Sequence, residues 1–90
     1  MSASVTDMRD FIEALRVRVP REIHPCAHEA IRWWFADMRD ADPAHVVRLA
    51  AKVRHRIVDE LRWEAVKQTT ARDYRAAHKL RRRADRFAHG

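Results

Sequence analysis

Residues 42–70, DPAHVVRLAAKVRHRIVDELRWEAVKQTT, decide the fold of this 90-residue chain. Asp42 can cap a helix and Pro43 suits its first position, so the pair predicts a helix that begins at Pro43. Apolar side chains then recur every three or four residues and form a stripe that drifts round the helix: Val46, Leu49, Ala50, Val53, Ile57, Leu61 and Ala65. The stripe stops before Lys67-Gln68-Thr69-Thr70, where we expect a break.

The segments before this stretch also have helical spacing. Residues 4–18 carry an apolar stripe, and Ser4 and Asp7 have the spacing of a capping box. Residues 25–39 begin with Pro25, which suits the first turn of a helix. Apolar side chains cover most of the circumference of this second segment, which predicts that it is the central helix of the fold.

The segment after this stretch completes the pattern. Thr70 and Asp73 again have cap spacing. The helix that follows is expected to have one apolar face, formed by Tyr74, Ala77, Leu80, Ala84 and Phe87. No Gly or Pro separates the two last helices, so they are either two helices or one rod from Pro43 to Ala88, about 68 Å long, that would require an oligomer.

Composition supports an all-α fold, a compact bundle of about four helices. The chain has one Gly and three Pro, too few for the tight turns of a β protein. Ninety residues are within the size of one domain, so we interpret residues 1–90 as a single helical domain. Small domains gain stability from association, and a homo-oligomer is therefore an open expectation.

The same composition bounds the location of the protein. Apolar residues make up 47% and charged residues 36%, and no apolar run approaches the ~18 residues of a membrane span. The first residues lack the basic and apolar regions of a secretory signal. Cys26 is the only cysteine, which fits a reducing compartment. We expect a soluble, cytoplasmic protein without a membrane partner.

Basic charge is concentrated at the end of the chain. Residues 71–90 hold seven basic and two acidic residues, and so carry +5 of the net +6. At 100° per residue, six cations fall within an arc of roughly 100° opposite the apolar face: Arg72, Arg75, Lys79, Arg82, Arg83 and Arg86. Such a stripe can follow a phosphate backbone. A solvated helix face or an acidic protein partner would explain the same pattern.

A second, weaker basic set lies in the preceding helix. Arg48, Lys52 and Arg56 share its solvent side with Trp63, interrupted by Asp59. An indole among cations can stack on bases. A narrower hypothesis makes residues 25–39 and the helix from Pro43 a helix-turn-helix, with these cations facing DNA. The turn between them argues against it, because it lacks Gly and is acidic.

Aromatic residues offer a protein interface. Trp33, Trp34 and Phe35 are consecutive, so their side chains point in three directions about 100° apart. Either all three lie in the core, or at least one of them meets a partner. Trp33, Trp34 and Trp63 are the candidate interface residues.

Metal and catalytic sites are not expected. His24, Cys26 and His28 are close in sequence, but their spacing matches no zinc finger and no fourth ligand is apparent. We interpret His24 as a helix cap, Cys26 as a residue that points to the core and His28 as a surface residue. No glycine loop or nucleophile motif is present, so we predict neither an enzyme nor a cofactor.

Two classes of function remain, and no segment matches a known family motif. The first is a small non-enzymatic nucleic-acid-binding or regulatory protein, with the six C-terminal cations on the phosphates of DNA or RNA. The second is a protein-binding module: an adaptor, an assembly subunit or a phage-type inhibitor that docks on an acidic or nucleic-acid-binding surface of its partner.

Overall fold

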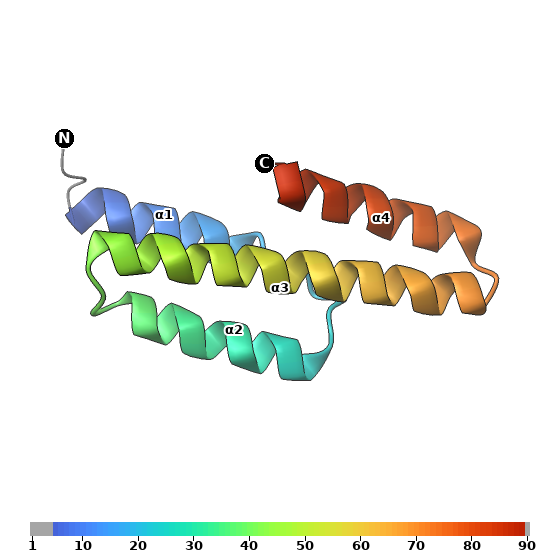
Figure 1. The fold of residues 1–90 in the computed structure, drawn as a ribbon, viewed down its shortest axis with the longest axis horizontal. Helices are drawn as coiled ribbons and strands as arrows, with labels where there is room; N and C mark the ends of the chain where they lie inside the picture. The colour runs from blue at the N-terminus through green and yellow to red at the C-terminus, as the bar shows by residue number, and fades with distance from the viewer. Residues whose placement is uncertain (1–4, 90) are drawn as a thin grey trace.

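The computed structural model describes residues 5–89 and gives an all-α bundle, which confirms the predicted fold class (Figure 1). Its helices are α1 (Val5–Val17), α2 (Pro25–Met38), α3 (Pro43–Thr70) and α4 (Tyr74–His89). Residues 5–89 contain no strand. The predicted cap at Ser4 and Asp7 lies outside the residues whose side chains are described.

The start of α3 is the one that its sequence predicts. The Asp42 carboxylate accepts a hydrogen bond from the backbone N–H of His45 at 2.9 Å, and Pro43 occupies the first helical position. The cap satisfies one of the N–H groups that a helix leaves free at its N-terminus. The 28 residues of α3 span about 42 Å at 1.5 Å per residue, nearly the full 48 Å length of the molecule.

The end of α3 differs from the prediction. The helix continues through residues 67–70 and stops at Ala71, so the expected break lies a few residues too early. The N–H of Asp73 donates to the carbonyl of Gln68 at 2.8 Å, and the N–H of Arg72 donates to that of Thr69 at 3.0 Å. These two bonds form a Schellman motif, which satisfies the free carbonyls and reverses the chain.

Helices α3 and α4 are therefore separate, and the single-rod alternative is wrong. The first turn of α4 is capped by the Asp73 carboxylate, which accepts from the N–H of Ala76 at 3.1 Å. Thr70, the other candidate cap, instead donates its hydroxyl to the carbonyl of Val66 within α3. Helix α4 runs back along α3 as the second arm of a helical hairpin (Figure 1).

The central helix is α3, not α2 as its apolar circumference had indicated. Helix α3 packs against each of the other three helices, whereas α4 packs on α3 alone. Helix α2 buries only one face, formed by Ala27, Ile31, Phe35 and Met38. The apolar residues of α2 therefore predicted more burial than the structure shows, because Trp33 faces solvent.

The drift of the α3 stripe explains where the other helices lie. From Val46 to Ala65 the apolar positions advance by steps of three or four residues that together turn about 100° round the helix. The first half of the stripe is covered by α1 and α2, and the second half by α4 (Figure 1). Val53, Ile57 and Leu61 are fully buried at the centre.

Helix α4 approaches α3 with small side chains. Ala77 and Ala84 are fully buried, and Phe87 closes the far end of this face. Alanine lets two helix backbones come close, since no long side chain separates them. Tyr74, predicted to belong to this face, is instead 65% exposed.

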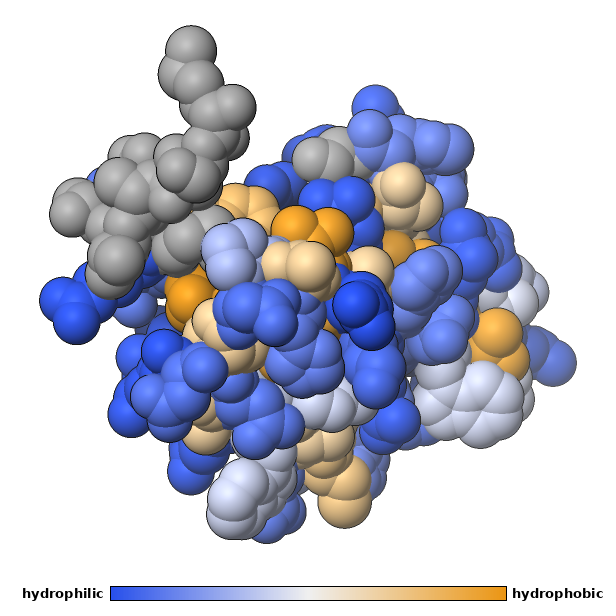
Figure 2. Space-filling model, turned by 60° about the vertical axis from the view of Figure 1, so that its left-hand side comes forward, coloured by the Kyte–Doolittle hydropathy of each residue, from blue (hydrophilic) through white to orange (hydrophobic). Residues whose placement is uncertain are grey.

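Hydrophilic side chains cover most of the face drawn in Figure 2, with apolar ones in separate patches among them. Within residues 5–89, no helix combines the length and the apolar character that crossing a bilayer requires. The partly buried Ile12 and the buried Leu15 join α1 to the core, while Phe11 remains 44% exposed.

The turn between α3 and α4 generates a stability prediction. Arg72 has a φ of 62°, in the left-handed region that costs a residue with a Cβ roughly 1–2 kcal/mol. Arg72→Gly should raise the free energy of unfolding by about 1 kcal/mol, after the extra freedom of Gly in the unfolded chain is deducted. The midpoint of thermal unfolding, followed by circular dichroism, should rise by about 4–8 °C.

Arg72→Ala is the matched control, because it removes the same charge and keeps the Cβ. It should leave the midpoint nearly unchanged. A loss of stability in Arg72→Gly would show that the left-handed turn does not form in solution.

Candidate anion-binding surface

The outer face of α4 carries a row of four exposed cations, Arg75, Lys79, Arg82 and Arg86. We call this set the α4 row. Their spacing of four, three and four residues places them within an arc of about 60° and along about 17 Å of helix. No member of the α4 row forms an ion pair with another side chain of residues 9–89.

The packing of α4 keeps this row in solvent. The buried residues Ala77, Ala84 and Phe87 lie on the side of α4 that faces α3, and the row lies on the opposite side. Because α4 packs on α3 alone, no other helix covers its outer half. Arg81, on a flank of α4, donates to the hydroxyl of Thr69 at 3.0 Å and joins the two arms of the hairpin.

Two of the six predicted cations are placed differently from the row. Arg72 belongs to the turn after α3 and has left-handed backbone angles, so helical spacing does not align it with α4. Arg83 lies at the edge of the outer face and donates from Nη1 to Oε1 of Glu22 at 2.8 Å. The structure thus aligns four of the six predicted cations, with Arg83 beside them and Arg72 outside the helix.

The contact of Arg83 with Glu22 lies at a groove that sequence reasoning missed. A space of about 470 Å³ separates residues 17–22 from the end of α4. We call it the loop groove, and four arginines line it: Arg18, Arg21, Arg83 and Arg86. The cluster of arginines near Pro20 was the available signal, but its partners lie about sixty residues away, beyond the reach of local pattern analysis.

Arg18 is held in the loop groove by an aromatic ring. Its guanidinium carbon lies 5.5 Å from the centre of the Phe87 ring, within the range of a cation–π interaction. This contact and the Arg83–Glu22 pair tie the end of α4 to the connection between α1 and α2. The loop groove is therefore held by contacts from both of its sides.

The second basic set is not part of this surface. Arg48 and Lys52 are exposed, but they lie on the side of α3 away from α4. Arg56 is half-buried, and its Nε lies 3.1 Å from Oε1 of Glu60, so its charge is paired. Helices α2 and α3 run side by side in opposite directions (Figure 1), which does not match the steep crossing of a helix-turn-helix.

The three tryptophans have different environments. Trp33 is 66% exposed on α2 and Trp63 is 59% exposed on α3, as an interface would require. Trp34 is half-buried and packs against the core, and Phe35 is buried. Trp34 is thus placed as a packing residue, whereas Trp33 and Trp63 are available to a partner.

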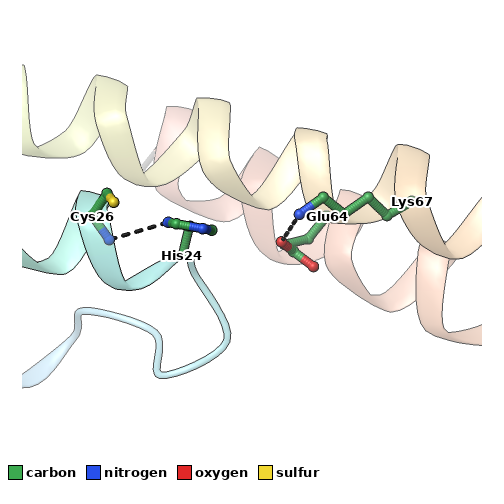
Figure 3. Close-up of polar contacts among 4 residues, drawn as sticks. All are labelled: His24, Cys26, Glu64 and Lys67. Atoms are coloured by element: carbon green, nitrogen blue, oxygen red, sulfur yellow. Dashed lines mark hydrogen bonds and ion pairs between the residues drawn. The ribbon is translucent and has the colours of Figure 1, made fainter.

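The cluster around Cys26 is a helix start (Figure 3). Nδ1 of His24 accepts a hydrogen bond from the backbone N–H of Cys26 at 3.1 Å, which confirms His24 as the cap of α2. Cys26 is exposed and His28 is half-buried, the reverse of the prediction. Among residues 9–89, no group of three or more side chains is arranged to hold a metal ion.

Figure 3 also shows an ion pair between two side chains near the C-terminal end of α3. Nζ of Lys67 donates to Oε1 of Glu64 at 3.0 Å. Glu64 and Gln68 border a second groove of about 500 Å³ on the same edge of the hairpin as Lys79, Arg83 and Arg86. Two carboxylates, those of Glu22 and Glu64, therefore line this groove together with three cations of α4.

Comparison with known proteins adds no relative: no family model, no curated protein and no solved structure matches the chain. The interpretation of the site therefore rests on its own geometry and charge.

The electrostatics of the loop groove are visible at Glu22. Its pKa lies below the ordinary value of 4.5, first because the carboxylate accepts a hydrogen bond from its own backbone and next because it accepts one from Arg83. Burial acts in the opposite direction and raises the pKa, and the nearby charges of Arg83 and Arg21 each lower it by less than burial raises it. Hydrogen bonds to the Glu22 carboxylate, one of them from Arg83, are thus the main reason for its lowered pKa.

Arg83→Gln should raise the pKa of Glu22 toward 4.5, because the charged hydrogen bond is lost while the backbone hydrogen bond remains. NMR titration of the Glu22 carboxyl group measures the change. The lowered pKa also means that the ionised Glu22 carboxylate, through its backbone hydrogen bond and then its bond to Arg83, stabilises the fold above pH 4.5, and that this contribution is lost as the pH falls through the folded-state pKa.

Arg21→Gln is the matched control, because Arg21 acts on Glu22 through charge and not through a hydrogen bond. Its effect on the pKa of Glu22 should have the same sign and be smaller. An unchanged pKa in Arg83→Gln would mean that the 2.8 Å pair is not formed in solution.

Proposed function

We propose that this chain is a small non-enzymatic nucleic-acid-binding or regulatory protein that contacts the phosphate backbone through the α4 row. One observation carries the proposal: four exposed cations without acidic partners among residues 9–89 are aligned on the outer face of a helix that packs on α3 alone. Each turn of α4 thus presents at least one cation to a ligand that approaches from this side.

The chemistry of the row suits phosphates. Three of its four residues are arginines, and a guanidinium can donate two parallel hydrogen bonds to one phosphate. The width of an α-helix with its side chains, about 10–12 Å, is compatible with the major groove of a duplex. Contacts with phosphates position a nucleic acid without reading its bases, so the proposed binding has no sequence preference.

The proposal includes a cytoplasmic location. The lone thiol of Cys26 is exposed and has no intrachain partner with which to form a disulfide. A reducing compartment keeps such a thiol free. Nucleic acid is present in the same compartment.

The test of the α4 row is the salt dependence of binding. Replacing Arg75, Lys79 and Arg82 together by Gln should weaken binding to all sequences equally and flatten the slope of log affinity against log salt by about 2.7, since each phosphate contact contributes about 0.9. Fluorescence anisotropy with labelled DNA and RNA duplexes of unrelated sequence gives both quantities. Circular dichroism should show unchanged helicity, because these side chains point away from α3.

A charge-matched variant separates the row from net charge. Arg9, Arg32 and Arg39 are exposed on α1 and on or just after α2. Replacing these three by Gln removes the same charge and should flatten the slope by less than 1. Equal effects of the two triple variants would reduce the interaction to nonspecific attraction and would contradict the proposal.

The exposed tryptophans favour a second candidate, a protein-binding module such as an adaptor, an assembly subunit or an inhibitor. Trp33 and Trp63 leave large apolar surfaces in water, and tryptophan is enriched among residues that dominate protein interfaces. In this candidate the α4 row docks on an acidic or nucleic-acid-binding surface of the partner. Nucleic acid would then bind no better to the native chain than to the α4 triple variant.

The tryptophans also support self-association. Sedimentation velocity should show a concentration-dependent homo-oligomer that Trp33→Ala weakens by at least about tenfold, because a central interface tryptophan contributes about 2 kcal/mol or more. Val17→Ala, which also changes an exposed apolar side chain, is the control and should have a smaller effect. A monomer at high micromolar concentration would contradict the prediction of a homo-oligomer.

A further inference from the structure

The loop groove brings together cations from two distant parts of the sequence. Arg18 and Arg21 come from the connection after α1, and Arg83 and Arg86 come from the end of α4. Its volume of about 470 Å³ exceeds what one phosphate needs, and it is open to solvent. Four guanidiniums that line one groove repel each other unless an anion lies between them.

The chain supplies one such anion itself. Glu22 lies in the loop groove, and its carboxylate accepts the 2.8 Å hydrogen bond from Arg83. Its side chain is 52% exposed, so this pair is accessible to competing anions from solution. One carboxylate against four guanidiniums leaves a local excess of three positive charges.

The loop groove is continuous with the α4 row. Arg86 is the last member of the row and also lines the groove. A phosphate chain that follows the row from Arg75 toward Arg86 therefore reaches the groove after about 17 Å. Arg18 contacts the Phe87 ring at this end of α4 and lines the same groove as Arg86.

We propose that the loop groove is a second phosphate-binding site, in which Arg18 and Arg21 hold a phosphate group next to the backbone carried by the α4 row. In the free protein Glu22 accepts the hydrogen bond of Arg83, and its negative charge repels a phosphate that enters the groove. The site extends the proposed nucleic-acid function and rests on it for the identity of the ligand. Its phosphate chemistry can be tested without nucleic acid.

Inorganic pyrophosphate is the probe for the groove alone, with binding measured by isothermal titration calorimetry. Arg18→Gln with Arg21→Gln should weaken pyrophosphate binding by at least about tenfold, because two charged hydrogen-bond donors are lost. Glu22→Gln should tighten it about fivefold, since one like charge about 4 Å away is removed. Opposite effects of neighbouring substitutions are not expected from general loss of structure.

Controls for these variants lie on α2 or just after it, outside the lining of the loop groove. Arg32→Gln with Arg39→Gln removes the same charge as the double groove variant, and Glu29→Gln removes the same charge as the Glu22 variant. Both should change pyrophosphate affinity less than twofold. Equal effects of control and groove variants, or no effect of Glu22→Gln, would overturn the site.

Duplex binding then separates this inference from the proposed function. Arg18→Gln with Arg21→Gln should flatten the salt slope by about 1.8, in addition to the effect of the α4 triple variant. If the groove variants change pyrophosphate binding as stated while no duplex binds, the phosphate site in the groove is supported and the nucleic-acid-binding function is contradicted. If only the α4 variants change duplex binding and neither groove variant changes pyrophosphate binding, the nucleic-acid-binding function is supported and the phosphate site in the groove is contradicted.

Discussion

Burial of the apolar stripe of α3 is the interaction on which the remaining structure depends. Every other helix packs on α3, and α4 has no other helical neighbour. The fully buried Val53, Ile57 and Leu61 each stabilise the fold by about 1.5–3 kcal/mol relative to exposure. A domain of this size has a net stability of only about 5–15 kcal/mol, so these few side chains decide whether it folds.

The drift of that stripe has a consequence for the surface. Because the stripe turns round α3, its two halves face different directions and are covered by different helices (Figure 1). Helix α4 therefore has α3 as its one helical neighbour, and its outer half remains in solvent. Its end is then fixed by two contacts, Arg83 with Glu22 and Arg18 with Phe87. The bundle geometry thus both exposes the α4 row and brings the loop groove next to it.

The sequence predicted what local rules control and missed what they do not. Asp42, Pro43 and His24 act on neighbouring backbone groups, so the starts of α3 and α2 were predictable from residue type. The turn at Arg72 was not, because an arginine is an uncommon choice for left-handed angles that usually indicate Gly. The partnership of Arg83 with Glu22 depends on how α4 packs, which no helical wheel contains.

The cost of the α4 row is itself an argument about its role. The pairs Arg75–Lys79 and Arg82–Arg86 are like charges four residues apart, and together they destabilise the helix by about 0.4–1 kcal/mol. Arg86 near the C-terminus interacts favourably with the helix dipole, but Arg75 lies in the first turn, where a cation is unfavourable and the Asp73 cap is the acidic residue that offsets it. Solubility alone would be served by mixed charges on this face. A single-sign row that weakens its own helix is explained more readily by a polyanionic ligand that neutralises it.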